Sequence, residues 1–456
     1  MGNSEVPDAY SRGQPHLVGP AVQASPSLLR PSLTELVDRA QAAFIGVLAG
    51  DALGWRCETG GTLLGAPPIA SYGFAGWRMP GSSEEVLAGE TSDDSQLTLA
   101  VARSRVCGGA RTSSDWWPIW TETELPLWWL GERGGGRATR NAAASWALET
   151  APWDIEDNGE LRGYFHSGGN GVAIRALPHV LAHLTAATPE GLMKDVFLDG
   201  ITTHGHPRAL IGAQVLALAG YLLGQKRVTG EPGALIEAVL GYFPWRPPKS
   251  QPVWWQAAEQ AILRSQEIEW QEIAVEMKSM LEQVLTSVQG GMPADEVVDQ
   301  LGARGPMGGA GTVSVAAALH LVSRWQGDPL GAVVFAAESR ETDADSIASM
   351  TGGLLGLALG REWQPAAWDE VQDAALAKAL ATKIVSGQGE EAPRPVREMD
   401  LVKVRLALKG GANEVKLDGM RTATVTQPPR IEKNQEGNYL RWRLDTSDGQ
   451  RVYVRL

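Results

Sequence analysis

The stretch Ser32–Gly54, SLTELVDRAQAAFIGVLAGDALG, indicates the fold class of this chain. It opens on a serine that can cap a helix, continues with apolar residues at roughly helical spacing, and closes on a glycine. Alanine- and leucine-rich segments of the same kind recur at 92–106, 171–187, 206–223, 254–288, 311–326 and 346–360. Few stretches before residue 400 alternate with the period of a strand, so the sequence predicts a large all-α region.

Composition divides the chain into four predicted parts. Residues 1–30 are rich in Pro, Ser, Gly and Ala without periodicity, which predicts a flexible N-terminal segment. Residues 31–386 form the all-α domain, and 387–400, charged and containing proline, read as a linker. Residues 401–456 alternate polar and apolar side chains in VKVRLALKG, EVKLDGMRTATVTQ and YLRWRLDTSDGQRVYVRL, which predicts a small β-rich module with a turn at SDG.

Bulk composition limits the class of protein. With 456 residues and 43% hydrophobic content the chain can form a substantial core, and its two cysteines exclude a disulfide scaffold. No secretory signal pattern opens the sequence, and apolar runs such as 347–359 are too short to span a bilayer. We therefore expect a soluble cytoplasmic protein without a membrane partner.

Charge is distributed unevenly. The whole chain carries −13, which disfavours nonspecific binding of the main domain to nucleic acid, whereas residues 401–456 carry +5. The basic module could dock on the acidic domain of this chain, on a partner, or on nucleic acid. The simpler interpretation is that these charges form the solvated face of a sheet.

Two acidic clusters precede apolar segments, SDDS at 92–95 and DADS at 343–346. Helix capping is one explanation, because Ser and Asp satisfy the free amides of a first helical turn. Capping needs a single oxygen at each terminus, however, and each cluster supplies several. Hard cations such as Mg²⁺ prefer carboxylate and hydroxyl oxygens, so a metal site formed by both clusters is the second explanation. The second cluster lacks the loop glycine and the final glutamate of an EF-hand.

Six motifs follow one another along the chain: GVLAGDALGWRCE at 46–58, GETSDDS at 89–95, SGGNGVAIRALP at 167–178, THGHPRA at 203–209, GTVSVAAAL at 311–319 and ETDADSIASMTGGLLG at 341–356. In this order they resemble the motifs of ADP-ribosylglycohydrolases, the family of the dinitrogenase-reductase-activating glycohydrolase, over roughly residues 38–365. The resemblance implies an all-α orthogonal helical domain with a dinuclear Mg²⁺ centre, or a Mn²⁺ centre. It also implies removal of ADP-ribose from an arginine- or serine-linked protein side chain or from a related ADP-ribosyl conjugate.

The resemblance assigns roles residue by residue. The implied metal ligands are Ser92, Asp93, Asp94, Asp343, Asp345 and Ser346. The implied catalytic residues are Glu58, Asp51, Asp93 and Asp343, with Glu58 assisting proton transfer and Asp51 near the metals. The implied ADP-ribose contacts are Ser167, Gly168, Gly169, Asn170, Gly171 and His204. Without the resemblance, Asp51 could be a helix cap and Glu58 an ordinary loop acid.

Some features stay outside this assignment. The family commonly has glycines where this chain has Ser339, Arg340 and Glu341, and bulky charged residues there could change the acceptor that fits. Two other functions therefore stay open: a noncatalytic ADP-ribose-binding or structural member of the superfamily, and a hydrolase of a different N-ribosyl or nucleotide substrate.

Other motifs have simpler interpretations. His179 and His183 lie four apart on a presumed helix but lack a third zinc ligand, and His206 is interpreted as structural. Tryptophans in SDWWPIWTETELPLWWLG and PVWW are interpreted as packing residues, with stacking on adenine or arginine as the alternative. The loop GERGGGRAT at 131–139 is interpreted as flexible, with ligand contact as the alternative.

Overall fold

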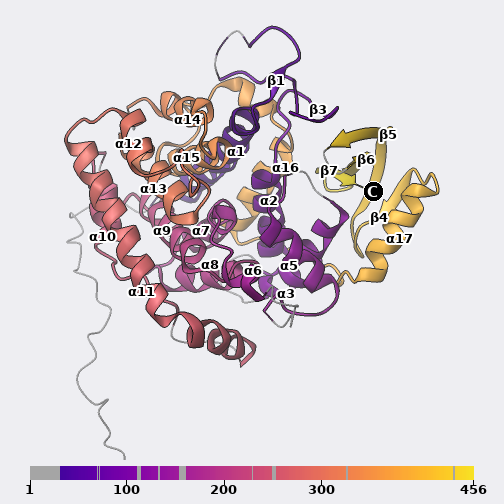
Figure 1. The fold of residues 1–456 in the computed structure, drawn as a ribbon, viewed down its shortest axis with the longest axis horizontal. Helices are drawn as coiled ribbons and strands as arrows, with labels where there is room; N and C mark the ends of the chain where they lie inside the picture. The colour runs from indigo at the N-terminus through magenta and orange to yellow at the C-terminus, as the bar shows by residue number, and fades with distance from the viewer. Residues whose placement is uncertain are drawn as a thin grey trace, which may run out of the picture.

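The computed structural model describes residues 31–455 except 69, 71, 110–114, 132–133, 154–160, 229, 249–252, 325–326 and 435–436, and only the backbone of 161–162, 253–269 and 434. The predicted N-terminal segment 1–30 and the side chains of PVWW lie outside the described residues. Most of the described chain is helical, as predicted, and a small sheet lies at one side of the helical body (Figure 1).

The longer helices of the body are α1 (Leu33–Thr59), α2 (Asp93–Cys107), α5 (Arg137–Ala147), α7 (Leu177–His183), α8 (Glu190–Ile201), α9 (Pro207–Gly224), α10 (Ala234–Leu240), α11 (Val253–Gln289), α12 (Ala294–Gln300), α13 (Gly311–Arg324), α14 (Pro329–Glu338), α15 (Ala344–Leu359) and α16 (Ala374–Ser386). Shorter turns are α3 (Trp116–Ile119), η1 (Trp120–Glu124), α4 (Leu125–Leu127), η2 (Trp128–Leu130), α6 (Leu161–Phe165), η3 (Asn170–Val172) and η4 (Ala366–Glu370). One extensive apolar core joins these helices. Within it, α9 has the length and apolar composition of a membrane span, but 94% of that window is buried inside the protein.

Helices α1 and α15 pack with their backbones in direct contact. Gly46, Gly50 and Gly54 recur every fourth residue and therefore share one face of α1. A Cβ added to Gly46 would lie 2.2 Å from the carbonyl oxygen of Gly352, and one added to Gly54 would lie 2.5 Å from Cα of Asp345. Only glycine permits this approach, which places the end of α1 beside the first turn of α15.

Three predictions about the helical body need correction. Helix α1 continues past Gly54 and ends at Thr59, because Gly54 serves helix packing and Gly60 adopts the left-handed conformation that ends the helix. The segment 171–187 is α-helical only in α7, after a 3₁₀ turn. The region also contains an antiparallel sheet of two-residue strands, β1 (Thr62–Leu63), β2 (Trp77–Arg78) and β3 (Glu85–Val86), which are too short to give a periodic signal.

The C-terminal part contains a helix that was predicted as a strand. The segment VKVRLALKG lies in α17 (Glu398–Lys409), so the helix also takes the last residues of the predicted linker. Its apolar residues satisfy both periods, but the buried set is Leu401, Val404 and Leu408 at helical spacing, while Leu406 is 64% exposed. Burial against the sheet therefore selects the helix.

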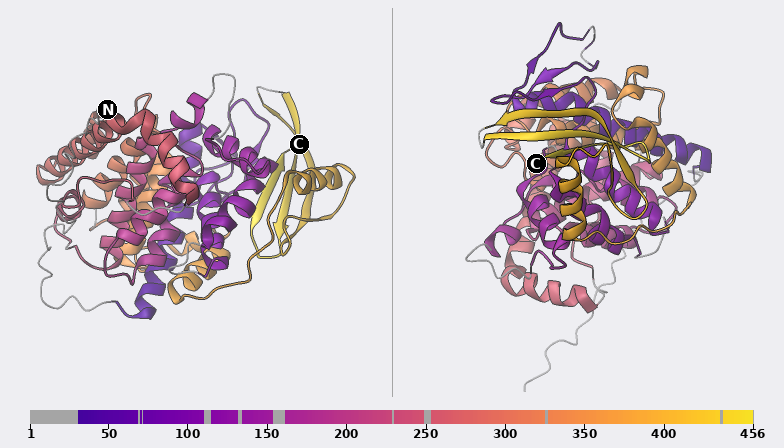
Figure 2. Two further views of the ribbon diagram at one scale, coloured as in Figure 1. Left: turned by 90° about the horizontal axis from the view of Figure 1, so that it is seen from below. Right: turned by 90° about the vertical axis from the view of Figure 1, so that its right-hand side faces the viewer.

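The predicted strands after α17 form an antiparallel sheet of order β4-β5-β6-β7. Its strands are β4 (Glu414–Lys416), β5 (Thr422–Asn434), β6 (Gly437–Thr446) and β7 (Arg451–Arg455). The predicted turn at SDG joins β6 to β7, in the register that pairs Arg443 with Tyr453. Figure 2 shows the sheet and α17 against one side of the helical body. A second apolar cluster joins Leu127 and Leu130 of the body to Val452 and Val454 of the sheet, so the two parts share a core.

Candidate functional site

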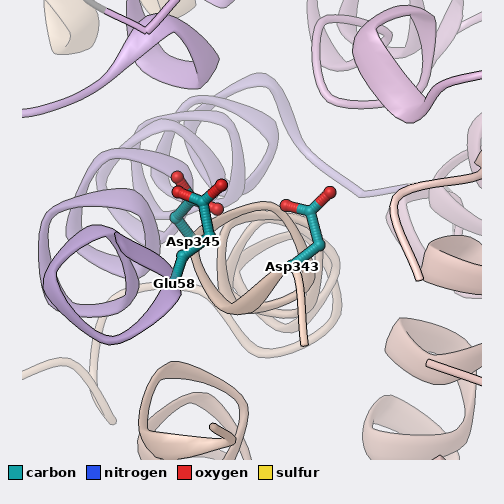
Figure 3. Close-up of side chains that lie close together, drawn as sticks. All are labelled: Glu58, Asp343 and Asp345. Atoms are coloured by element: carbon teal, nitrogen blue, oxygen red, sulfur yellow. The ribbon is translucent and has the colours of Figure 1, made fainter. Parts of the chain in front are cut away.

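The two acidic clusters and the end of α1 meet at one place. Glu58 is on the last turn of α1, and Asp343 and Asp345 begin α15; oxygens of these three side chains lie within 4.8 Å of one another (Figure 3). The N-terminus of α2 joins them, because Ser92 Oγ lies 3.5 Å from Asp345 Oδ2. Residues about 250 positions apart therefore line one acidic site, which we call the acidic cluster: Asp51, Glu58, Asp93, Asp94, Asp343 and Asp345.

Asp51 holds the first turn of α2 in place. Its side chain is fully buried, and its Oδ1 accepts a hydrogen bond from the amide of Ser92 at 2.9 Å. Its Oδ2 accepts from the amide and the hydroxyl of Ser95, at 3.0 and 2.6 Å. Asp51 thus caps α2 from a neighbouring helix, which orients the aspartates that follow Ser92.

Asp343 is the N-cap residue of α15 but makes no capping hydrogen bond with its side chain. Its Oδ2 instead accepts from the amide nitrogen of Asn170 at 3.0 Å. The Asn170 amide also donates to Ser314 Oγ at 3.1 Å, and Asn170 N donates to Gly309 O at 3.0 Å. Helix capping therefore does not explain Asp343, whose carboxylate faces the acidic cluster.

Burial and mutual repulsion raise the pKa values in the acidic cluster. Burial, followed by the charge of Asp343, raises the pKa of Glu58 to about 7, although part of this residue is exposed to solvent. Burial, followed by the charges of Asp51 and Glu58, raises the pKa of Asp93 to about 8. The pKa values of Asp94 and Asp345 are raised well above their usual range, first by burial and then by neighbouring carboxylates. Such anions are stable together only when protons or cations compensate them.

The residues fit a divalent cation better than a proton-only network. Oδ2 of Asp94 is buried and has no hydrogen-bond partner among the described residues. The oxygens around it come from carboxylates and serine hydroxyls, the ligand types that hard cations prefer. Four of the predicted ligands are buried: Ser92, Asp94, Asp345 and Ser346. The other two, Asp93 and Asp343, are partly exposed to solvent.

The predicted ADP-ribose loop 167–171 borders the acidic cluster through Asn170. Three of its amides are already used: those of Ser167, Gly168 and Asn170 donate to the carbonyls of Tyr164, His166 and Gly309. The loop therefore presents fewer free amides to a diphosphate than its glycine content suggests. Its conformation is fixed by pairing with the segment 309–311, since Gly311 N donates to Gly168 O at 2.9 Å.

His204 lies behind this loop. It is 4% exposed, and a Cβ on Gly171 would lie 3.2 Å from its Cε1. Burial, followed by the charge of Arg175, lowers the pKa of His204 to about 3, so the ring is neutral. Its Nδ1 lies 2.7 Å from Thr203 Oγ1, which fixes the ring beneath the loop.

Two contributors to the site were missed by sequence analysis. Buried Arg175 supports the loop by donating to Gly171 O and, through Nε, to both oxygens of Asp199 at 3.1 Å. Gly134, in the loop 131–139, lies so close to Asp93 that a Cβ would be 2.4 Å from Oδ1. The arginine at the end of SGGNGVAIR was a visible signal, and Gly134 lies in the loop GERGGGRAT, for which ligand contact was the alternative to flexibility.

The remaining candidates have structural roles. His183 lies 2.8 Å from Asp195 and His179 3.5 Å from Asp199, so the two histidines face different partners and not a common zinc position. His206 caps α9 by accepting from Arg208 N at 3.1 Å. The tryptophans Trp116, Trp120 and Trp128 are buried core residues.

The segment that departs from the resemblance lies at the surface. Arg340 and Glu341 are exposed, whereas Ser339 is buried. Glu341 has φ +64, a backbone conformation that glycine adopts without strain. A glycine would therefore suit this position, and the charged side chains beside Asp343 are a particular feature of this chain.

Comparisons with known proteins identify a family for this chain. The family model for ADP-ribosylglycohydrolase matches residues 32–393. An ADP-ribosyl-[dinitrogen reductase] glycohydrolase from Rhodospirillum rubrum is 32% identical over 176 residues, 37% of this chain; the match spans about half, 52%, of that relative's length. A solved ADP-ribosylglycohydrolase-related protein complex aligns with 78% of this chain and 99% of its own, at 22% identity and a TM-score of 0.49. The family match covers most of the sequence, and the chain belongs to the ADP-ribosylglycohydrolase family.

Proposed function

We propose that this protein hydrolyses the glycosidic bond between ADP-ribose and an acceptor, an arginine- or serine-linked protein side chain or a related conjugate. The observation that carries the proposal is the convergence of carboxylates from α1, α2 and α15 on one site, in which Oδ2 of Asp94 is buried and has no hydrogen-bond partner among the described residues. Family membership supports the reaction class. The name of the Rhodospirillum rubrum relative supports a protein-linked substrate.

The residues that would hold two divalent cations, Mg²⁺ or Mn²⁺, are Ser92, Asp93, Asp94, Asp343, Asp345 and Ser346. Bound cations would supply Lewis acidity and a water of lowered pKa. The chain itself does the positioning: Asp51 fixes the turn of α2, and Asn170 fixes the carboxylate of Asp343. Glu58, at the accessible side of the acidic cluster, is placed to move a proton to or from the scissile bond.

The setting of the reaction is also proposed. The free cysteines Cys57 and Cys107 suit the reducing cytoplasm. We assign the reaction to the region 31–386 and treat residues 401–456, together with α17, as an added module. The exposed Arg340 and Glu341 beside the site would influence which acceptor fits.

The test is a panel of arginine-, serine- and nucleic-acid-linked ADP-ribose with Mg²⁺, with Mn²⁺ and with EDTA. We expect cation-dependent release of ADP-ribose, and its loss in Asp93→Ala and Asp343→Ala while the helical circular dichroism signal persists. Asp328→Ala is the matched control, because Asp328 also begins a helix but does cap it, accepting from Gly331 N at 2.9 Å.

The panel separates the alternatives. Wild-type rates in Asp93→Ala or Asp343→Ala would show that the acidic cluster is not the reaction centre. Binding of ADP-ribose without turnover of any conjugate would favour a noncatalytic member of the family. Turnover confined to another N-ribosyl compound would assign a different substrate to the same site.

A further inference from the structure

The family match ends at residue 393, but the C-terminal module (α17 and β4–β7) contacts the segments that lead into the acidic cluster. We infer that this module sets the geometry of the cluster, and that Tyr453 of β7 and Glu90 are the positioning residues through which it acts. The inference rests on the proposed function in one respect, that the cluster binds divalent cations.

The first contact lies immediately before the metal-binding turn. The hydroxyl of Tyr453 donates a hydrogen bond to Oε1 of Glu90. The other oxygen of Glu90 accepts from the amide of Leu87 at 2.9 Å. Both partners are almost completely buried, with Tyr453 2% and Glu90 3% exposed. Glu90 is two residues before Ser92, so this carboxylate fixes the chain where it enters α2.

A bridge beside this contact strengthens it. The carbonyl of Gly89 accepts from Gln372 N at 2.9 Å, and the side chain of Gln372 donates to Arg451 O at 3.3 Å. The next residue, Asp373, accepts from Arg451 N at 2.8 Å. Gln372 thus joins the beginning of β7 to the chain before Ser92, and Asp373 adds a second contact to β7.

The second contact reaches α2 further along its length. Arg103 of α2 donates to Glu124 at 2.8 Å, and Arg421 of the module lies 2.8 Å from the same carboxylate. Arg421 also pairs with Asp418 at 2.7 Å. All four residues are at most 8% exposed, so screening by solvent is weak. This network fixes α2 relative to the sheet.

The third contact involves the loop that covers Asp93. A Cβ on Gly131 would lie 2.8 Å from Cβ of Arg455, at the end of β7. In the same loop, Gly134 lies against the carboxylate of Asp93. The end of β7 therefore contacts Gly131, three residues before the glycine that lies against Asp93.

These contacts matter because metal ligands must be held closely. A productive ligand geometry tolerates displacements of about 0.5 Å. Residues that orient ligands indirectly commonly change metal affinity by about 10- to 100-fold when they are altered. Tyr453 acts on the ligands through Glu90 and the backbone, so we expect an effect near the lower end of this range.

The test compares Tyr453→Phe with Tyr439→Phe in the full chain. Tyr439 is the matched control: its hydroxyl donates to Glu84 Oε2 at 3.1 Å across the same interface, while Arg441 holds the other oxygen at 2.7 Å. The readouts are Mn²⁺ affinity by isothermal titration calorimetry and the thermal midpoint. We expect about tenfold weaker Mn²⁺ binding in Tyr453→Phe and wild-type affinity in Tyr439→Phe. Equal Mn²⁺ affinity in the two variants would overturn the inference.

A second pair of variants, at Glu90, tests the same contact in case Tyr453→Phe does not fold. Glu90→Gln can keep both contacts, with its oxygen accepting from Leu87 N and its amide donating to Tyr453, so we expect near-wild-type affinity. Glu90→Ala removes both contacts and should resemble Tyr453→Phe. Glu90→Ala with wild-type Mn²⁺ affinity would contradict the assignment.

Failure of the inference and failure of the proposed function are distinguishable. If the wild-type protein binds Mn²⁺ but hydrolyses no ADP-ribosyl conjugate, the proposed reaction is wrong while the binding comparison still decides the role of Tyr453. If the wild-type protein binds neither Mn²⁺ nor Mg²⁺, the inference is overturned, and the turnover panel with EDTA decides separately whether the proposed hydrolysis occurs. In an active enzyme, Tyr453→Phe should raise the Mg²⁺ concentration for half-maximal activity and leave kcat at saturating Mg²⁺ largely unchanged.

Discussion

Replacing Gly54 by alanine tests how closely helix packing is coupled to the acidic cluster. The added Cβ would lie 2.5 Å from Cα of Asp345, whereas an ordinary carbon–carbon contact is about 3.5–4.0 Å, so α15 has to move by roughly 1 Å. Overpacking of this kind costs about 1–3 kcal/mol, against about 1 kcal/mol gained from the helix propensity of alanine. A displacement of about 1 Å at a reacting centre can cost about 100-fold in rate.

Gly46→Ala is the control for this prediction. Gly46 lies on the same face of α1, two helical turns before Gly54, and its Cβ would be 2.2 Å from Gly352 O rather than beside Asp345. An overpacking cost of about 3 kcal/mol, less the roughly 1 kcal/mol gained from helix propensity, leaves a net loss of about 2 kcal/mol. We expect both variants to lose about this much free energy of unfolding in chemical denaturation. Only Gly54→Ala should also lose Mn²⁺ affinity and hydrolysis. Wild-type Mn²⁺ affinity in a folded Gly54→Ala protein would refute the coupling of packing to the site.

Three further predictions concern stability. Glu341→Gly should raise the free energy of unfolding by about 1 kcal/mol, because φ +64 strains a residue with a side chain; an unchanged denaturation midpoint would contradict this. In EDTA the thermal midpoint should rise as pH falls from about 9 to about 7. The pKa values of Glu58 and Asp93 in the folded state, about 7 and about 8, exceed those in the unfolded state. The folded state therefore binds more protons over this range and is stabilised as they bind. A midpoint that falls over this range would show that these carboxylates are not buried together. Arg421→Met should lower the free energy of unfolding by about 3–5 kcal/mol, because it leaves the buried Glu124 with one cationic partner fewer. A loss below about 1 kcal/mol would show that the Arg421–Glu124 pair is screened by solvent.

Local chemistry explains why the acidic turns could be predicted. Ser92 and Asp343 precede apolar helical segments, and each does stand at the N-cap position of its helix. From the residues alone, convergence of the two turns on a metal was one of two explanations; the resemblance favoured it, because nothing in either segment specifies the other. The physical link is the spacing of Gly46, Gly50 and Gly54, which is visible in the sequence, although the helix that packs against them is not.

Other parts could not be predicted because long-range contacts decide them. The segment VKVRLALKG fits a strand and a helix equally well until burial of Leu401, Val404 and Leu408 selects the helix. Asp51 caps α2 only because the fold brings Ser92, 41 residues later in the sequence, to its side chain. The amides of the loop 167–171 looked free, but Asn170 N donates to Gly309 O, and the amides of Ser167 and Gly168 donate to the carbonyls of Tyr164 and His166.

The hydrogen bond between Tyr453 and Glu90 joins positions 363 residues apart. During synthesis at about 5–20 residues per second, α1 and α2 emerge long before β7. The hydrogen bond between Tyr453 and Glu90 can therefore form only near the end of translation. Contacts of such sequence separation also form slowly after release, because the loop they close is long. A nascent chain should therefore gain cation affinity late, after most of its helical content has formed.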